Sequence, residues 1–192
     1  IMLSRDKIIE GFVTKTIDQS MMEKYRKQYN LSFPWHSYIV GLVDIGRECT
    51  HEMKLKKGIK ESIEAFASEN LYGYVFDIGR YIGILFKYIP DYVLPRILKT
   101  LQEKISSTYG IMVTISTGKQ VDSADMLFQS YTQAHDLLEQ KFLYGHKQII
   151  IGTGDEDFGS GDKNISHEDE GIGNEADTGK VNDVYLEQMA KN

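Results

Sequence analysis

An unbroken apolar run constrains the fold of this chain more than any other feature. Residues 37–45 read Ser-Tyr-Ile-Val-Gly-Leu-Val-Asp-Ile, without alternation between polar and apolar side chains. A strand with one face in water alternates with a period of two, so a run without alternation is typical of a strand covered on both faces. The chain is therefore expected to build a sheet that other elements cover.

Periodicity elsewhere predicts the elements around this strand. Apolar residues recur at helical spacing in three later segments: 52–68, 91–109 and 124–143. Short strand-like runs recur in four others: 71–76, 81–88, 111–116 and 147–151. Asp77 to Arg80 joins the first two runs as a hairpin, Gly110 ends the second helix, and Ser123 is a good N-cap for the third. The order predicts an α/β (α+β) fold, close to the ferredoxin-like split β-α-β arrangement with helices on one side of the sheet.

A long amphipathic helix is expected before the sheet, over residues 1–30, with a break near Asp18 left open. Its apolar positions follow helical spacing: Ile8, Ile9, Phe12, Val13, Ile17, Met21 and Tyr25. This stripe exceeds what one small sheet is expected to cover, so the helix is interpreted as a connector. Its predicted interaction residues are Ile8, Phe12, Ile17 and Met21. Replacement of Ile8, Phe12 or Ile17 by Glu is expected to alter oligomerisation or solubility.

The net charge of −6 is unevenly placed along the 192 residues. From residue 152 to the end, eleven acids oppose three lysines, so this tail carries −8 and the rest of the chain carries +2. The stretch 152–180 is rich in Gly, Asp and Glu, and such a segment cannot bury enough apolar surface to offset its ordering entropy. We expect residues 152–192 to form an acidic flexible linker that ends in a short helical stub over 181–191.

Composition excludes several classes of protein. The single cysteine, Cys49, excludes an internal disulfide framework and suits a reducing cytoplasm. No apolar run reaches the ~18 residues of a membrane span, and no secretory signal opens the sequence. A body at +2 has no clustered cations for nucleic acid. The N-terminal Ile1 suggests a piece of a longer protein.

The segment 130–150 carries a resemblance to a known family. It reads Ser-Tyr-Thr-Gln-Ala-His-Asp-Leu-Leu-Glu-Gln-Lys-Phe-Leu-Tyr-Gly-His-Lys-Gln-Ile-Ile, that is, Ser-Tyr, a helix, an aromatic residue, Gly and a short strand. With the strand ending at Asp44, it resembles the degenerate GGDEF-like domain that lies between the receiver and DNA-binding domains of AraC-type two-component response regulators. The resemblance covers residues 31–151, and Gln133 stands where that family has Glu.

The diguanylate cyclase signature can be tested against the hairpin, where the GGDEF resemblance places it. Arg80 falls where a metal-binding carboxylate is required, and Asp77 and Ile78 replace two glycines that let the backbone approach a phosphate. A cation in place of a carboxylate repels the metal that would neutralise a triphosphate. One surviving carboxylate, Asp44, is too few, so no enzyme activity is expected. Residues 154–158 in the acidic tail read Gly-Asp-Glu-Asp-Phe, which resembles the cyclase signature in a different order; this likeness is attributed to chance.

The resemblance therefore implies a non-catalytic regulatory module in the cytoplasm, which needs no metal or cofactor. It implies a receiver domain upstream and an AraC-type helix-turn-helix domain downstream, both outside this chain, and it leaves homodimerisation open. This fragment is expected to touch neither nucleic acid nor membrane. The alternative is a small-molecule or nucleotide sensor with a vestigial ligand cleft at Asp44, Asp77, Gly79 and Arg80. An active cyclase is the third reading.

Tyrosines on the middle hairpin are expected mainly to pack, with Tyr72, Tyr74 and Phe76 on one face.

Overall fold

A computed structural model describes residues 4–33, 36–46, 52–70, 73–87, 89–140 and 148–154. All the described residues belong to the first of the two units into which the chain divides, residues 1–156. Expectations for Cys49, Tyr72, the helix end at 141–143, the start of the last strand and the acidic tail from residue 155 fall outside the described residues. Among those described, no helix is long and apolar enough to cross a membrane.

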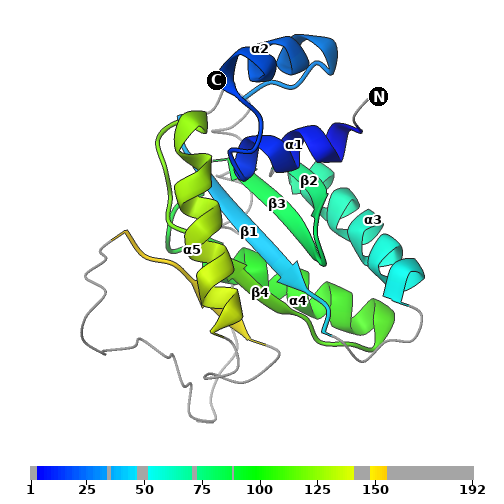
Figure 1. The fold of residues 1–192 in the computed structure, drawn as a ribbon. Helices are drawn as coiled ribbons and strands as arrows, with labels where there is room; N and C mark the ends of the chain where they lie inside the picture. Colours follow the sequence, from blue (N-terminus) through cyan, green and yellow to red (C-terminus); the bar gives the residue numbers. More distant parts are fainter. Residues whose placement is uncertain are drawn as a thin grey trace. The chain divides into compact units, whose positions relative to one another are not determined.

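A five-stranded sheet in the order β2-β3-β1-β4-β5 forms the centre of the first unit (Figure 1). Its strands are β1 Tyr38–Asp44, β2 Gly73–Ile78, β3 Tyr81–Lys87, β4 Thr114–Thr117 and β5 Ile149–Ile151. The central strand β1 pairs antiparallel with β3 and with β4, and β5 adds parallel to β4. The predicted α+β fold class is confirmed, because β1 lies between β3 and β4 as the split β-α-β arrangement requires.

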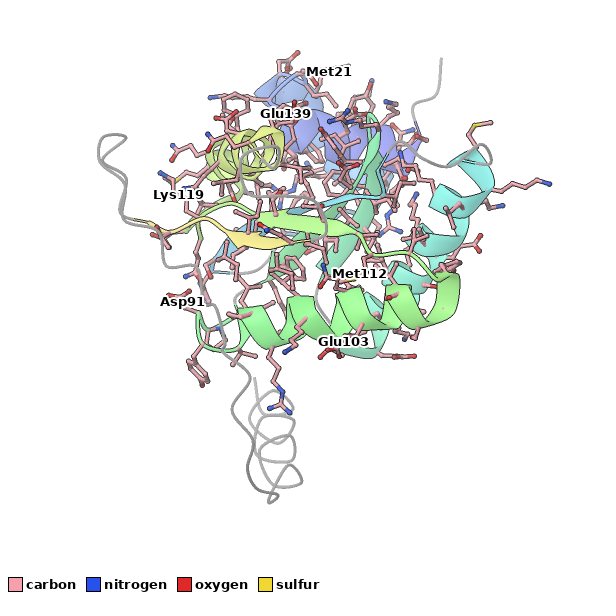
Figure 2. All side chains as sticks on the ribbon, turned by 90° about the horizontal axis from the view of Figure 1, so that it is seen from below. Met21, Asp91, Glu103, Met112, Lys119 and Glu139 are labelled. Carbon is pink, nitrogen blue, oxygen red and sulfur yellow. The ribbon has the colours of Figure 1, made fainter. Side chains whose placement is uncertain are left out.

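Helices cover both faces of the sheet, not one (Figures 1 and 2). The helices are α1 Arg5–Val13, α2 Gln19–Gln28, α3 Glu52–Asn70, α4 Leu94–Tyr109 and α5 Leu127–Glu139, the last preceded by the 3₁₀ turn η1 Ala124–Met126. Buried residues of α3 and α4 form one core with the sheet, and buried residues of α1 and α5 form a second core on its other face. The expectation of helices on one side was wrong because the lead-in helix and the last helix supply a second layer.

The two cores explain why β1 lacks alternation. Ile39 and Val43 contribute to the core under α3 and α4, whereas Val40 and Leu42 contribute to the core under α1 and α5. Successive side chains of a strand point to opposite faces, so both sets of positions must be apolar when both faces are covered.

The N-terminal lead-in is two helices instead of one long helix. Asp18 caps α2, since its Oδ1 accepts a 2.9 Å hydrogen bond from the Met21 amide. Lys15, in the link between the helices, has a φ of 57°, which a continuous helix cannot hold. Ile8 and Phe12 of α1 are buried in the second core. The sheet therefore covers much of the apolar stripe of residues 1–30, which was expected from the sequence to remain uncovered.

Helix α5 is joined to the central strand by a buried hydrogen bond. The Val40 amide donates to the Ser130 hydroxyl at 2.9 Å, and the Ser116 hydroxyl donates to the Ala134 carbonyl at 2.7 Å. Beyond the β4 pairing, β1 continues through a bridge between Tyr38 and Val121. Ser130, the first residue of the Ser-Tyr pair on which the resemblance rests, is thus a contact between helix and sheet.

Candidate functional site at the β2–β3 hairpin

The hairpin between β2 and β3 turns on two residues, Gly79 and Arg80. Gly79 has a φ of 54°, in the left-handed region that favours glycine. A side chain placed there would meet no atom within 4 Å. The glycine is therefore required by the conformation of the turn, not by close approach of another group.

Asp77 faces α3 and is held there by two lysines. The Lys60 Nζ lies 2.9 Å from Oδ2 of Asp77, and the Lys56 Nζ lies 3.2 Å from Oδ1. Burial alone would raise the pKa of Asp77, but hydrogen bonds from Lys60 and Lys56 outweigh it and lower the pKa below its ordinary value. The carboxylate is therefore ionised and already neutralised by ammonium groups.

Helix α1 contributes to the same cluster through Asp6. Its carboxylate accepts a hydrogen bond from Lys60 and a second one, of 3.0 Å, from the backbone amide of Asp77. The amide belongs to β2, an edge strand of the sheet, where backbone donors lack a neighbouring strand. Burial would lower the pKa of Lys60, but hydrogen bonds to Asp6 and Asp77 raise it above its ordinary value. Asp6, Lys60 and Asp77 thus tie α1, α3 and β2 together.

Arg80 forms hydrogen bonds at the end of α5. Its guanidinium donates to Oε1 of Glu139 at 3.0 Å and to the Tyr81 hydroxyl at 2.6 Å, and Tyr81 in turn donates to Glu139. The hydrogen bond from Tyr81 lowers the pKa of Glu139 most, and the charge of Arg80 adds to this effect. Burial, followed by the Glu139 contact, raises the pKa of Tyr81. We call Arg80, Tyr81 and Glu139 the hairpin clasp.

Asp44 does not join Asp77 and Arg80 at one site. It is 6% exposed at the end of β1, and its Oδ1 accepts a 3.0 Å hydrogen bond from the Gly46 amide. By strand alternation it lies on the α1 and α5 face with Leu42, whereas Asp77 lies on the α3 face with Val75. The two carboxylates that the sequence placed in one cleft are therefore on opposite faces of the sheet.

An open hollow of about 640 Å³ lies between α3 and the hairpin. It is lined by Met53, Lys56, Lys57, Lys60, Asp77, Gly79 and Arg80. Three of the predicted cleft residues line it, and Asp44 does not. The lysines of α3 were not identified from the sequence as part of this site. The pattern that could have indicated them is the spacing of four between Lys56 and Lys60, which places both on one helix face.

Magnesium, which the cyclase resemblance would imply, does not fit this donor set. Hard cations are bound by converging carboxylate and carbonyl oxygens. The Asp77 carboxylate is bonded to two ammonium groups, and Arg80 presents a third cation at the turn. Within the described part of the chain, no group of three or more His, Cys, Asp or Glu residues could hold a metal ion.

The predicted interaction residues divide between the core and the surface. Ile8 and Phe12 are at most 3% exposed, and Ile17 is half-buried with its side chain against Gly11. Met21, on α2, is 38% exposed and is the one member of the set that presents a large apolar side chain to solvent. Ile8 and Phe12 therefore serve the core of this unit.

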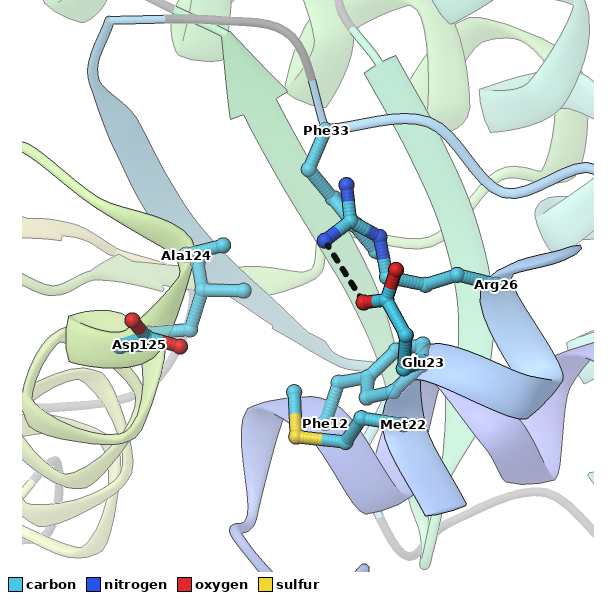
Figure 3. A pocket seen from close by; sticks show the side chains of 8 residues that line it. Phe12, Met22, Glu23, Arg26, Phe33, Ala124 and Asp125 are labelled. Atoms are coloured by element: carbon cyan, nitrogen blue, oxygen red, sulfur yellow. Dashed lines mark ion pairs between the residues drawn. The ribbon is translucent and has the colours of Figure 1, made fainter. Parts of the chain in front are cut away.

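A second pocket, of about 70 Å³, lies beside α2 (Figure 3). It is lined by Phe12, Met22, Glu23, Arg26, Phe33, Ala124, Asp125 and Leu127. The Phe12 and Phe33 rings are arranged edge to face with their centroids 5.5 Å apart, and the Arg26 guanidinium lies over the Phe33 ring. Ligand pockets typically exceed about 300 Å³, so this pocket is a packing gap.

The described tyrosines of the sheet pack within this unit and form hydrogen bonds there. Tyr74 and Phe76 share a face, as the alternation predicted, and both pack in the second core. The Tyr74 hydroxyl bonds to both the amide and the carbonyl of Ser32, and the Tyr38 hydroxyl donates to the Phe33 carbonyl. These rings are not arranged as an exposed stacking surface.

Comparison with known proteins finds one kind of similarity. No family model matches the chain, and no curated protein matches it. Among solved structures, the chain is similar to the coiled coil and GGDEF domain of DgcB from Caulobacter crescentus, a structure in complex with c-di-GMP. The TM-score is 0.45, the sequence identity is 10%, and the match covers 76% of this chain and 80% of the other. Similarity at this level carries nothing about a site or an activity; the strand order and helix packing of the chain itself define its fold class.

Proposed function

We propose that this chain is a non-catalytic regulatory module of a two-component response regulator. In this proposal it couples a receiver domain to an AraC-type helix-turn-helix domain, both outside the chain. The observation that carries the non-catalytic part is the commitment of the hairpin charges to internal contacts. Asp77 is paired with Lys56 and Lys60, and Arg80 is paired with Glu139.

The contrast with what a nucleotidyl-transfer site requires supports this proposal. Such chemistry depends on metal ions held by carboxylates beside the phosphates. Here an arginine stands where the resemblance places a carboxylate, and the carboxylate of the hairpin itself, Asp77, is neutralised by lysines. The position in a response regulator rests on the resemblance of residues 130–150 to the GGDEF-like domains of AraC-type regulators.

Two experiments test the proposal. The purified chain, incubated with GTP and Mg²⁺ or Mn²⁺, is expected to release neither pyrophosphate nor a cyclic dinucleotide; either product above a no-protein blank would refute the non-catalytic part. For the coupling role, the sequence that flanks this segment in its gene should encode a receiver before it and paired helix-turn-helix motifs after it. Absence of both would refute the coupling role.

A sensor of an anionic small molecule is the second candidate, and the hollow beside α3 favours it. Three lysines and an arginine line the hollow against one carboxylate. Calorimetry with GTP, GMP and cyclic di-GMP, each without a divalent metal, tests this candidate. Binding that is lost in Lys57→Ala and Arg80→Ala but kept in Lys54→Ala supports it, since Lys54 is exposed on α3 outside the hollow. No heat change with any of the three nucleotides counts against a nucleotide sensor.

A further inference from the structure

Two segments that are distant in sequence meet a third segment, which lies within α5. They are residues 118–119 after β4, residues 130–133 within α5, and residues 152–153 after β5. The Gly118 amide donates to the Val40 carbonyl at 2.9 Å. A side chain on Gly118 would collide with the backbone carbonyl of Ser130. Glycine is therefore needed here for close approach of the chain to α5.

The side-chain amide of Gln133 links the other two segments. Its Oε1 accepts a hydrogen bond from the Lys119 amide, and its Nε2 donates to the Thr153 carbonyl at 3.2 Å. Gly152 lies directly beneath this side chain, because a Cβ on Gly152 would sit 2.7 Å from Cδ of Gln133 and 2.9 Å from the Thr117 carbonyl oxygen. The Gly152 amide donates to that carbonyl at 2.8 Å.

We propose that Gln133 is the positioning residue that fixes the direction in which the chain leaves the sheet after β5. Through this one side chain, α5 holds the exit at Gly152 and Thr153 against the end of β4. Both halves of the amide are used, one as acceptor and one as donor. A glutamate could supply only the acceptor at neutral pH, and its second oxygen would face the Thr153 carbonyl, another acceptor.

The consequence for signalling rests on the proposed function. If the chain is a regulatory module, the segment after β5 leads to the next domain. A shift of α5 would then move this segment as well, because Gln133 ties the helix to it. The exit contact itself holds whether or not the module belongs to a response regulator. A measurement on this chain alone therefore separates the two claims.

Amide hydrogen exchange of this 192-residue chain tests the contact residue by residue. The first reporter is the Lys119 amide, which donates to Oε1 of Gln133. The second is the Gly152 amide, which donates to the Thr117 carbonyl and directly precedes Thr153, whose carbonyl accepts from Nε2 of Gln133. Gln133→Glu removes the donor alone, so exchange at Gly152 is expected to rise on the order of five- to tenfold while Lys119 keeps its protection. Gln133→Ala removes both and is expected to accelerate both amides. Gln129→Glu, the same chemical change at an exposed position of α5, is expected to alter neither.

Two results would overturn the proposal. One is wild-type protection of Gly152 in Gln133→Glu. The other is an equal rise at Gly152, Lys119 and the Ile115 amide, which bonds to the Gln148 carbonyl between β4 and β5. Such uniform acceleration would mean that Gln133 stabilises the whole unit and has no particular role at the exit. A selective rise at Gly152, combined with unchanged transcription from the full regulator carrying Gln133→Glu, would retain the contact and refute its role in output.

Discussion

The amide of Val40, in the central strand, donates a 2.9 Å hydrogen bond to the hydroxyl of Ser130 on α5. Both residues are completely buried. The pairing of β1 with β4 extends only as far as Gly41, so a side chain replaces the neighbouring strand as the acceptor at Val40. A buried backbone donor without an acceptor is costly, and this contact accounts for a serine inside an otherwise apolar helix face.

Ser130→Ala is expected to lower the free energy of unfolding by about 1–3 kcal/mol, because it leaves the Val40 amide unsatisfied. Urea denaturation measures this loss. Ser123→Ala is the matched control, since the Ser123 hydroxyl forms no capping hydrogen bond, and its effect is expected to stay within about 0.5 kcal/mol. Equal losses for the two variants would contradict the role given to Ser130.

Asp77 is expected to make the stability of the unit depend on pH under acidic conditions. Because its pKa in the folded protein lies below the ordinary value of 3.8, its contribution is complete above pH 3.8 and is lost as the pH falls through the lowered pKa. Asp77→Asn removes the titrating group. The difference in melting temperature between wild type and Asp77→Asn should therefore shrink as the pH is lowered below 3.8. A difference that stays constant or grows at acidic pH would contradict the ion pairs with Lys56 and Lys60.

The hairpin clasp predicts a charge-swap rescue. Arg80→Glu places a carboxylate against Glu139, and Glu139→Arg places a guanidinium against Arg80, so each single change is expected to cost up to about 1 kcal/mol at this partly exposed pair. The double variant restores opposite charges and is expected to recover part of the loss. A double-mutant cycle by chemical denaturation measures the coupling. Strict additivity of the two single effects would show that the contact contributes nothing.

The buried face of α1 predicts unfolding rather than altered assembly. Ile8→Glu introduces a carboxylate at a position with no exposed surface, and it is expected to cost several kcal/mol or to prevent folding. Met21→Glu, on the exposed side of α2, is expected to leave the melting temperature nearly unchanged. Circular dichroism and sedimentation velocity on both variants separate stability from assembly. A folded Ile8→Glu protein with altered oligomeric state would restore the interaction helix to its role as a connector.

Local pattern was sufficient for much of the fold. The helix predicted over 91–109 is found over 94–109, and its left-handed cap at Gly110 follows from the conformational freedom of glycine. The predicted four-residue turn at 77–80 was wrong, because β2 continues through Asp77 and Ile78 and leaves a turn of two residues before β3. Ser123 begins only a 3₁₀ turn before α5. Such end positions depend on which backbone groups find partners in the folded chain, and periodicity does not encode that.

The candidate site was harder to predict than the fold. The sequence placed Asp77, Gly79 and Arg80 on one hairpin, and these three do line one hollow. It could not place Lys56 and Lys60 beside Asp77, because that contact needs α3 to dock along β2. Nor could it separate Asp44 from Asp77, since a shared end of the sheet does not tell which face each carboxylate takes.

The sequence by itself determined the element order, the α+β class and the place of Asp77, Gly79 and Arg80 on one hairpin. All three depend on residue identity or on neighbours a few positions apart. The tertiary structure alone decided that α1 covers the second face of the sheet, that the hairpin charges pair with α3 and α5, and that Gln133 reaches the exit of β5. Those contacts join residues separated by 17 to 71 positions. Their geometry is set by strand order and helix docking, which the pattern along the chain does not specify.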